Sequence, residues 1–263
     1  MEDILSKIIQ VKGARVEASK REVSAERLFE QAIVRRSLSR PHTFLNVLNQ
    51  SPGLNIIAEF KRRSPSRGDI RKDVEPAELA RRYQAGGAKA ISVLTEEDHF
   101  AGSLNDLVAV REAVSLPILR KDFIFDEYQI YETAATGADA LLLIVAALED
   151  DLLRDLRRIT EDELGLDALV EVHNEEEMTR AIAAGSKLIG VNNRDLRTFA
   201  VSLETSVKLA SKAPEETTLV SESGLNSTPD LRHLRKLGFD AFLIGESLMR
   251  SADPESALRA LIR

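Results

Sequence analysis

The chain of 263 residues contains no cysteine, which excludes disulfides, thiol nucleophiles and thiolate metal ligands. Long apolar runs are also missing. The best of them, residues 138–148, falls well short of the ~20 residues that a membrane-spanning helix needs. The first three residues, Met1-Glu2-Asp3, are acidic and lack the basic region and apolar core of a signal peptide. We therefore expect a cytoplasmic protein without a membrane partner.

Net positive charge is absent as well. The formal net charge of -7 argues against nucleic acid as a partner. A hydrophobic content of 43% and a charged content of 30% are ordinary for a globular protein. The four histidines, His42, His99, His173 and His233, show no close zinc-ligand spacing. We expect them to have structural or surface roles, and we predict no metal site.

From residue 55 onward, one pattern repeats: a short apolar run, a polar turn and a segment of helical periodicity. The predicted strands are 55–60, 90–94, 117–120, 140–145, 168–172, 188–191, 218–220 and 241–244. The predicted helices are 76–85, 104–114, 127–135, 150–160, 175–184, 203–211, 229–237 and 254–262. Eight such units predict an α/β fold, the (β/α)8 TIM barrel. The alternative is an open doubly wound sheet, which should show a glycine-rich fingerprint after an early strand; none is present.

Residues 1–54 do not follow this repeat. They contain three short apolar stripes with helical spacing, the last of which ends at Ser51-Pro52-Gly53. We interpret residues 1–54 as an N-terminal helical extension packed on the barrel, and residues 55–263 as the catalytic barrel. The extension is also expected to cover one mouth of the barrel and to help bind substrate.

Charged side chains gather at the ends of the predicted strands. Glu59 and Lys61 point to one face of the first strand, because strand side chains alternate. Lys121, Glu171 and Glu222 lie at or just beyond the ends of the third, fifth and seventh predicted strands. Alternate strands share one layer inside a barrel, and the chemistry of such barrels lies at the carboxyl ends of their strands. We therefore predict one cavity in which paired lysines and glutamates perform acid–base catalysis.

A phosphate site is predicted beside that cavity. Ser223-Gly224 and Gly245-Glu246 end the last two strands, where backbone N–H groups bind phosphate in this fold. Lys61 and Arg194 would supply positive charge. Glu246 is expected to point its side chain away and to offer only its N–H.

These residues resemble the indole-3-glycerol phosphate synthase family of tryptophan biosynthesis. The resemblance covers essentially the whole chain, and the matching phrases follow the family's order from the first strand to the last. They are Ile57-Ala58-Glu59-Phe60-Lys61, Ser64-Pro65-Ser66, Ser92-Val93-Leu94-Thr95-Glu96, Leu119-Arg120-Lys121-Asp122-Phe123, Leu169-Val170-Glu171-Val172-His173, Gly190-Val191-Asn192-Asn193-Arg194-Asp195-Leu196, Ser221-Glu222-Ser223-Gly224 and Leu243-Ile244-Gly245.

The resemblance implies an enzyme that closes the indole ring of 1-(2-carboxyphenylamino)-1-deoxyribulose 5-phosphate and releases CO2 and water, without a cofactor. It implies that Lys121 is the general acid at the substrate ketone. Glu171 and Lys61 would serve the later proton transfers, and Glu59 would orient and tune the lysines. Relatives also occur fused to, or associated with, neighbouring pathway enzymes, so the resemblance allows such partners.

The resemblance also assigns substrate contacts. Asn192 and Glu222 would hydrogen-bond the sugar hydroxyls and the developing intermediate, and Ser64 would bind the carboxylate. The residues on or near the phosphate are Arg194, Ser223, Gly224, Gly245 and Glu246. The apolar candidates for gripping the aromatic ring are Pro65, Phe100, Phe123, Leu143, Leu196, Phe199 and Leu225.

The residues alone leave three alternative functions: a phosphosugar isomerase, a class I aldolase and a phosphate-binding module. Phosphosugar isomerases of the same fold use a cysteine base, or two aspartates where this chain has Glu59 and Glu171. A class I aldolase would use Lys121 as a Schiff-base amine. A phosphate-binding module without turnover would not need this set of acid–base residues.

Overall fold

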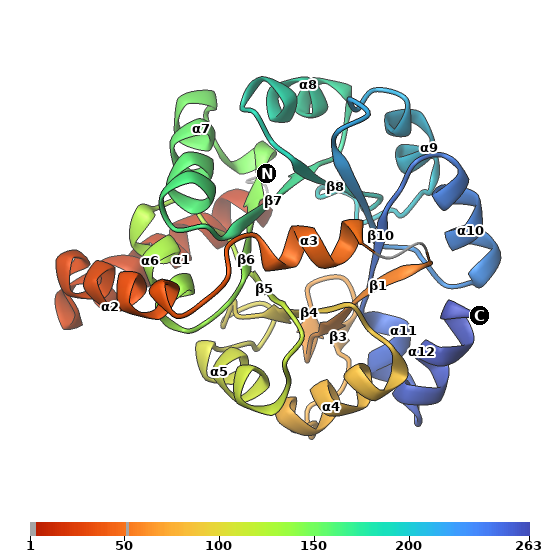
Figure 1. Ribbon diagram of the computed structural model, residues 1–263, viewed down its shortest axis with the longest axis horizontal. Coiled ribbons are helices and arrows are strands. Elements are labelled where there is room, and N and C mark those ends of the chain that lie inside the picture. The colour runs from red at the N-terminus through yellow and green to blue at the C-terminus, as the bar shows by residue number, and fades with distance from the viewer. Residues whose placement is uncertain (1–3, 51–52) are drawn as a thin grey trace.

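The computed structural model describes residues 4–50 and 53–263. Its centre is a closed barrel of eight parallel strands in the order β1-β10-β9-β8-β7-β6-β5-β4 (Figure 1). The strands are β1 (Asn55–Phe60), β4 (Ala90–Leu94), β5 (Ile118–Lys121), β6 (Ala140–Ile144), β7 (Asp167–Val172), β8 (Leu188–Asn192), β9 (Thr218–Glu222) and β10 (Ala241–Ile244). The predicted TIM barrel is confirmed, and closure of the ring excludes the open sheet.

A ring of helices surrounds the strands (Figure 1). They are α4 (Pro76–Gly86), α5 (Leu104–Ala113), α6 (Glu127–Ala135), α7 (Asp150–Arg158), α8 (Glu175–Ala183), α9 (Glu204–Ala210), α10 (Thr228–Lys236) and α12 (Pro254–Ile262). Their bounds agree with the predicted ones to within one or two residues. Where one continuous helix was expected, α7 ends at Arg158 and a π-helical turn, Ile159–Glu163, follows.

Three short elements were not predicted. A two-stranded hairpin, β2 (Arg63–Ser64) and β3 (Gly68–Asp69), lies in the loop after β1. A 3-10 turn, Val145–Ala147, follows β6, and the five-residue helix α11 (Glu246–Arg250) follows β10. All three lie at the carboxyl ends of barrel strands, where loops build the functional sites of this fold.

The alternation of side chains along β1 is as expected. Ile57 packs inside the barrel, whereas Ala58 and Phe60 belong to the larger apolar cluster between strands and helices. The barrel interior is therefore a packed core rather than a pore. Its residues are Ile57, Ala90, Leu119, Ala140, Leu142, Ile144, Leu169, Leu188, Val220, Ala241 and Leu243.

Helix α3 (Thr43–Asn49) closes the amino-terminal end of the barrel, and in Figure 1 it lies across the centre of the ring of strands. Phe44 and Leu48 are fully buried in the interior cluster. The Leu45 N–H donates to Asp167 at 2.9 Å, and the Asn55 side chain donates to the Leu48 carbonyl at 2.8 Å. The helix is thus tied to the first residues of β7 and β1.

Helix α1 (Ile4–Glu22) reaches the opposite end of the barrel, and α2 (Ala25–Ser37) packs against α6 (Figure 1). In α1, Lys12 is buried and its ammonium lies 2.8 Å from Asp122, which follows β5. The predictions that fall on residues 1–3 and 51–52 lie outside the described residues. Within the described parts of the chain, no helix is both long and apolar enough to cross a membrane.

Candidate active site

A cavity of about 660 Å³ opens at the carboxyl ends of the barrel strands. Helix α1 contributes Ile4, Leu5 and Ile8 to its wall, so the extension contributes to the cavity at this mouth. Every site residue expected from sequence lines this cavity except Leu143. Those residues are Glu59, Lys61, Ser64, Pro65, Phe100, Lys121, Phe123, Glu171, Asn192, Arg194, Leu196, Phe199, Glu222, Ser223, Gly224, Leu225, Gly245 and Glu246.

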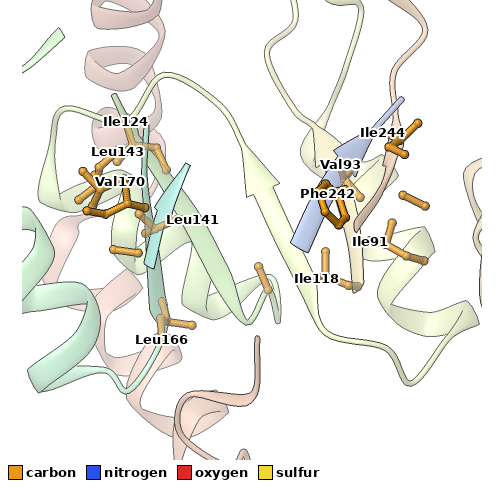
Figure 2. Close-up of a cluster of buried hydrophobic side chains, with 14 of the residues drawn as sticks. Ile91, Val93, Ile118, Ile124, Leu141, Leu143, Leu166, Val170, Phe242 and Ile244 are labelled. Atoms are coloured by element: carbon orange, nitrogen blue, oxygen red, sulfur yellow. The ribbon is translucent and has the colours of Figure 1, made fainter. Parts of the chain in front are cut away.

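The expectation for Leu143 is wrong. Figure 2 shows Leu143 with Val170 and Ile124 in the apolar cluster between the strands and the outer helices. Its neighbours Leu142 and Ile144 line the cavity instead. Because side chains alternate between the two faces of a strand, Leu143 faces the outer helices when Leu142 and Ile144 face the cavity.

At the base of the cavity, Lys121 joins two carboxylates. Its ammonium lies 3.0 Å from an oxygen of Glu171 and 3.0 Å from an oxygen of Glu222. The three side chains come from β5, β7 and β9, alternate strands of the barrel, as predicted. Burial would lower the pKa of Lys121, but the charges of Glu171, Glu222 and Glu59 outweigh burial and raise it. Lys121 is therefore a protonated ammonium at neutral pH.

The pKa values of the two carboxyl groups beside Lys121 are shifted in opposite directions. For Glu171, burial acts to raise the pKa, but Lys121 and His173 outweigh burial and hold it well below its usual range. For Glu222, burial raises the pKa to about 7, with support from the charges of Glu171 and Glu59 and against the attraction of Lys121. Glu171 is thus ionised, and Glu222 can hold or release a proton near neutral pH. Such a divergence marks separate acid and base roles.

Two glycines make room for the carboxylates, a role that the sequence analysis missed. A Cβ atom on Gly190 would lie 2.2 Å from Oε1 of Glu222, and one on Gly245 would lie 2.3 Å from Oε1 of Glu59. Gly245 was expected only as a phosphate ligand. Gly190 stands inside the apolar strand β8, and a glycine at such a position signals the close approach of another group. That signal was available in the sequence.

Glu59 and Lys61 form an ion pair at the end of β1, as their common face predicted. Arg194, after β8, connects the loops around the cavity. Its guanidinium donates to the Phe199 carbonyl at 3.3 Å and to the Ser66 hydroxyl at 3.4 Å. The loop after β1 and the loop after β8 therefore meet above the buried charges.

The expected phosphate region lies at the end of β9 and the start of α11. Ser223 and Gly224 both have positive φ, at 66° and 77°, so the chain turns sharply as β9 ends. Glu246, at the start of α11, lies 3.5 Å from Arg67 and 3.2 Å from Arg250. Both arginines line the cavity, and sequence reasoning did not identify either of them. The region holds a carboxylate between two cations.

An acidic cluster lies apart from the buried charges. The carboxyl oxygens of Glu96, Glu97 and Asp98 are within 4.8 Å of one another, close enough to hold a metal ion. Lys12 lies 3.0 Å from Glu97, and Arg15 lies 2.7 Å from Asp98. The protein's own cations therefore already contact two members of this cluster.

Residues 5–261 match the model of a protein family described as indole-3-glycerol phosphate synthase. This chain belongs to the indole-3-glycerol phosphate synthase family. A relative of that name from Carboxydothermus hydrogenoformans is 46% identical over 98% of this chain and 99% of its own length. One from Chloroherpeton thalassium is 49% identical over 94% of this chain and 95% of its own length. One from Rhodococcus opacus is 56% identical over 80% of this chain and 78% of its own length.

Membership of the indole-3-glycerol phosphate synthase family confirms the resemblance inferred from the motifs. Solved structures of more distant proteins show the same fold. A thiamine phosphate pyrophosphorylase from Pyrococcus furiosus matches with a TM-score of 0.60 at 17% identity, over 79% of this chain and 93% of its own. An N-acetylmannosamine-6-phosphate 2-epimerase from Clostridium perfringens matches with a TM-score of 0.60 at 16% identity, over 83% and 94%.

Proposed function

We propose that this protein closes the indole ring of 1-(2-carboxyphenylamino)-1-deoxyribulose 5-phosphate, with loss of CO2 and water. The observation that carries the proposal is the Lys121 ammonium, held 3.0 Å from both Glu171 and Glu222 at the base of a cavity large enough for the substrate. Family membership supports the same reaction.

Ring closure begins when the ring carbon that bears the carboxylate attacks the ketone carbon of the sugar chain. Lys121 donates a proton to the ketone oxygen, which becomes a hydroxyl. Release of CO2 returns the electron pair of the broken C–C bond to the ring and restores its aromaticity. The raised pKa of Lys121 keeps the ammonium protonated until the oxygen develops negative charge.

Dehydration then forms the pyrrole double bond. An acid protonates the hydroxyl, which leaves as water with the help of the electron pair of the ring nitrogen. A base then removes a proton from the carbon between the nitrogen and the carbon that carried the hydroxyl. We assign these transfers to Lys61 and Glu171, with Glu59 orienting Lys61 through their ion pair. Glu222, with a pKa of about 7, is suited to hydrogen-bond the intermediate in either protonation state.

The remaining cavity residues bind the substrate. Ser64 faces the carboxylate, Asn192 the sugar hydroxyls, and Arg194 the phosphate, together with the backbone at Ser223-Gly224 and Gly245-Glu246. Phe100 and Phe123, with ring centroids 6.2 Å apart, form an apolar wall for the aromatic ring. Pro65, Leu196 and Leu225 complete that wall.

The aldolase alternative is disfavoured by the same geometry. A Schiff base requires a neutral amine, and the two carboxylates beside Lys121 stabilise its ammonium form. We further propose that the protein acts in the cytoplasm, without a cofactor, and that it can associate with other enzymes of tryptophan biosynthesis.

The experiment that tests this function measures indole fluorescence after the protein is mixed with 1-(2-carboxyphenylamino)-1-deoxyribulose 5-phosphate in EDTA. Because the chain contains no tryptophan, indole emission reports product alone. We expect emission to rise together with an equal amount of CO2. Substrate that binds and stays unchanged would contradict the proposal and favour a binding module.

A further inference from the structure

His173 directly follows β7, and its ring lies between two carboxylates. Its Nδ1 atom is hydrogen-bonded to Oε2 of Glu177 in α8 at 3.0 Å, and its Nε2 atom lies 3.4 Å from Oε1 of Glu171, within ion-pair distance but without a hydrogen bond. The His173 side chain is 11% exposed. Glu171 uses its other oxygen, Oε2, to contact Lys121. Each oxygen of the Glu171 carboxylate thus faces a different nitrogen group.

Glu177 is itself fixed at the start of α8. Its Oε2 accepts the backbone N–H of His173 at 2.8 Å, and its Oε1 accepts the Asn174 side-chain amide at 2.8 Å. Asn174 caps the helix by accepting the Glu177 N–H at 3.0 Å. A carboxylate in the first turn of a helix is also stabilised by the helix dipole. The ring of His173 therefore has a rigid support on the side away from the cavity.

The balance of buried charge at the base of the cavity depends on the protonation of Glu222. When Glu222 is ionised, Glu59, Glu171 and Glu222 supply three carboxylates, whereas Lys61 and Lys121 supply two ammonium groups. Buried carboxylates without a cation are costly. An imidazolium at His173 would add a third positive charge at Glu171, the group that must stay ionised.

We propose that His173 is a positioning residue: supported by Glu177, its imidazolium holds the Glu171 carboxylate in place against Lys121 and supplies a third positive charge to the cluster when Glu222 is ionised. This inference rests on the proposed function, because it assigns His173 to the group that serves dehydration. Burial would lower the pKa of His173, but Glu171 on β7 and Glu177 on α8, the charged groups that face it, raise it to about 10.

The first test follows the protonation of the imidazoles by NMR in the protein without substrate. The His173 signal is identified by its absence in His173→Asn. We expect both ring nitrogens of His173 to stay protonated up to about pH 9, far above the usual imidazole pKa of ~6.5. In Glu177→Gln the titration should move down toward neutrality, because one facing carboxylate is lost. A His173 that titrates near pH 6.5 in the unmodified protein overturns the inference.

The second test is kinetic. Asparagine at position 173 retains a donor near Glu177 but cannot reach Glu171, so His173→Asn should lower kcat about tenfold to a hundredfold, because a small misplacement of a catalytic group is costly. KM should change little, and the acid limb of the pH profile should move to higher pH as the pKa of Glu171 rises. An unchanged kcat and pH profile would overturn the inference.

The matched control is His42→Asn. His42 lies 3.0 Å from Asp167, so it forms a histidine–carboxylate pair at the opposite end of the same strand. We expect His42→Asn to leave kcat and the pH profile unchanged. Failure of the proposed function is distinguishable, because the unmodified protein would then make no indole, while the NMR titration would still test the state of His173. If His173→Asn does not fold, Glu177→Gln replaces it in both tests, with a lower His173 titration and a lower kcat as the expected results.

Discussion

Lys12 of α1 and Asp122 after β5 form a buried ion pair, with 2.8 Å between Nζ and Oδ2. Asp122 also lies 3.1 Å from the fully buried Arg120 and follows Lys121 in sequence. A helix of the extension is therefore fixed directly beside the candidate general acid.

Replacing Lys12 by methionine should loosen α1. Asp122 would keep Arg120 but lose one buried cation, and breaking a buried pair costs ~3 kcal/mol. We expect unfolding at lower urea and a KM about fivefold higher, since ~1 kcal/mol of binding would be lost when the cavity wall loosens. The control is Arg15→Met, three residues along the helix, whose pair with Asp98 is exposed and worth at most about 1 kcal/mol. Equal effects of the two changes would contradict a special role for Lys12.

Removing the ammonium of Lys121 should abolish ring closure. Lys121→Ala should lower kcat by about 10²–10⁴, the usual contribution of a general acid, while product still binds in the cavity. Indole fluorescence measures turnover, and product binding can be titrated separately. Turnover above a hundredth of the normal value would exclude Lys121 as the acid. The exposed Lys208 on α9 provides a control, and Lys208→Ala should behave like the unmodified protein.

The raised pKa of Glu222 predicts that the stability of the protein depends on pH. Its pKa rises from 4.5 to about 7 on folding, so between these values the folded protein binds more protons than the unfolded chain. The stabilising contribution of Glu222 is complete below about pH 4.5 and is lost as the pH rises through about 7. We expect Glu222→Gln to gain stability relative to the unmodified protein over this window. Parallel stability curves from urea unfolding at several pH values would refute the assignment.

The space left by Gly190 and Gly245 can be tested with single methyl groups. Gly190→Ala should displace the Glu222 carboxylate, and Gly245→Ala the Glu59 carboxylate, because each Cβ would lie within 2.3 Å of an oxygen. We expect kcat to fall more than about tenfold, since small displacements of catalytic groups are costly. Gly13→Ala is the matched control: no atom lies within 4 Å of the added methyl in α1, and alanine favours a helix. Its stability should rise slightly, with kcat unchanged.

Much of the site could be predicted from sequence because strand periodicity determines which side chains point into the barrel mouth. Glu59 and Lys61 share a face by alternation, and Lys121, Glu171 and Glu222 end alternate strands of one barrel. Leu143, which was assigned through the resemblance, lies on the opposite face of β6, because alternation gives the cavity face to Leu142 and Ile144. The role of Gly190 was also missed, although a glycine inside an apolar strand signals a close approach. The role of His173 escaped prediction because it depends on the position of Glu177 on another element.

The extension was harder to interpret, because its helices have separate destinations. Apolar spacing predicted helices in residues 1–54 but not that α3 would close one end of the barrel while α1 lines the cavity at the other. Lys12 would be expected on a solvated face from its residue type alone. Its ion pairs with Glu97 and with Asp122, 110 positions later in the chain, explain its burial.

The position of α3 has a consequence for synthesis. Its partners appear late: Thr43 bonds Asp139 at 2.9 Å, Leu45 bonds Asp167 at 2.9 Å, and Asn49 bonds Thr218 at 2.8 Å. On the ribosome, the part of the chain that is made early therefore cannot complete its contacts until β9 has emerged. Such distant pairings slow folding. Phe44 and Leu48 lack most of their barrel partners during that interval, and apolar side chains left uncovered in this way promote aggregation.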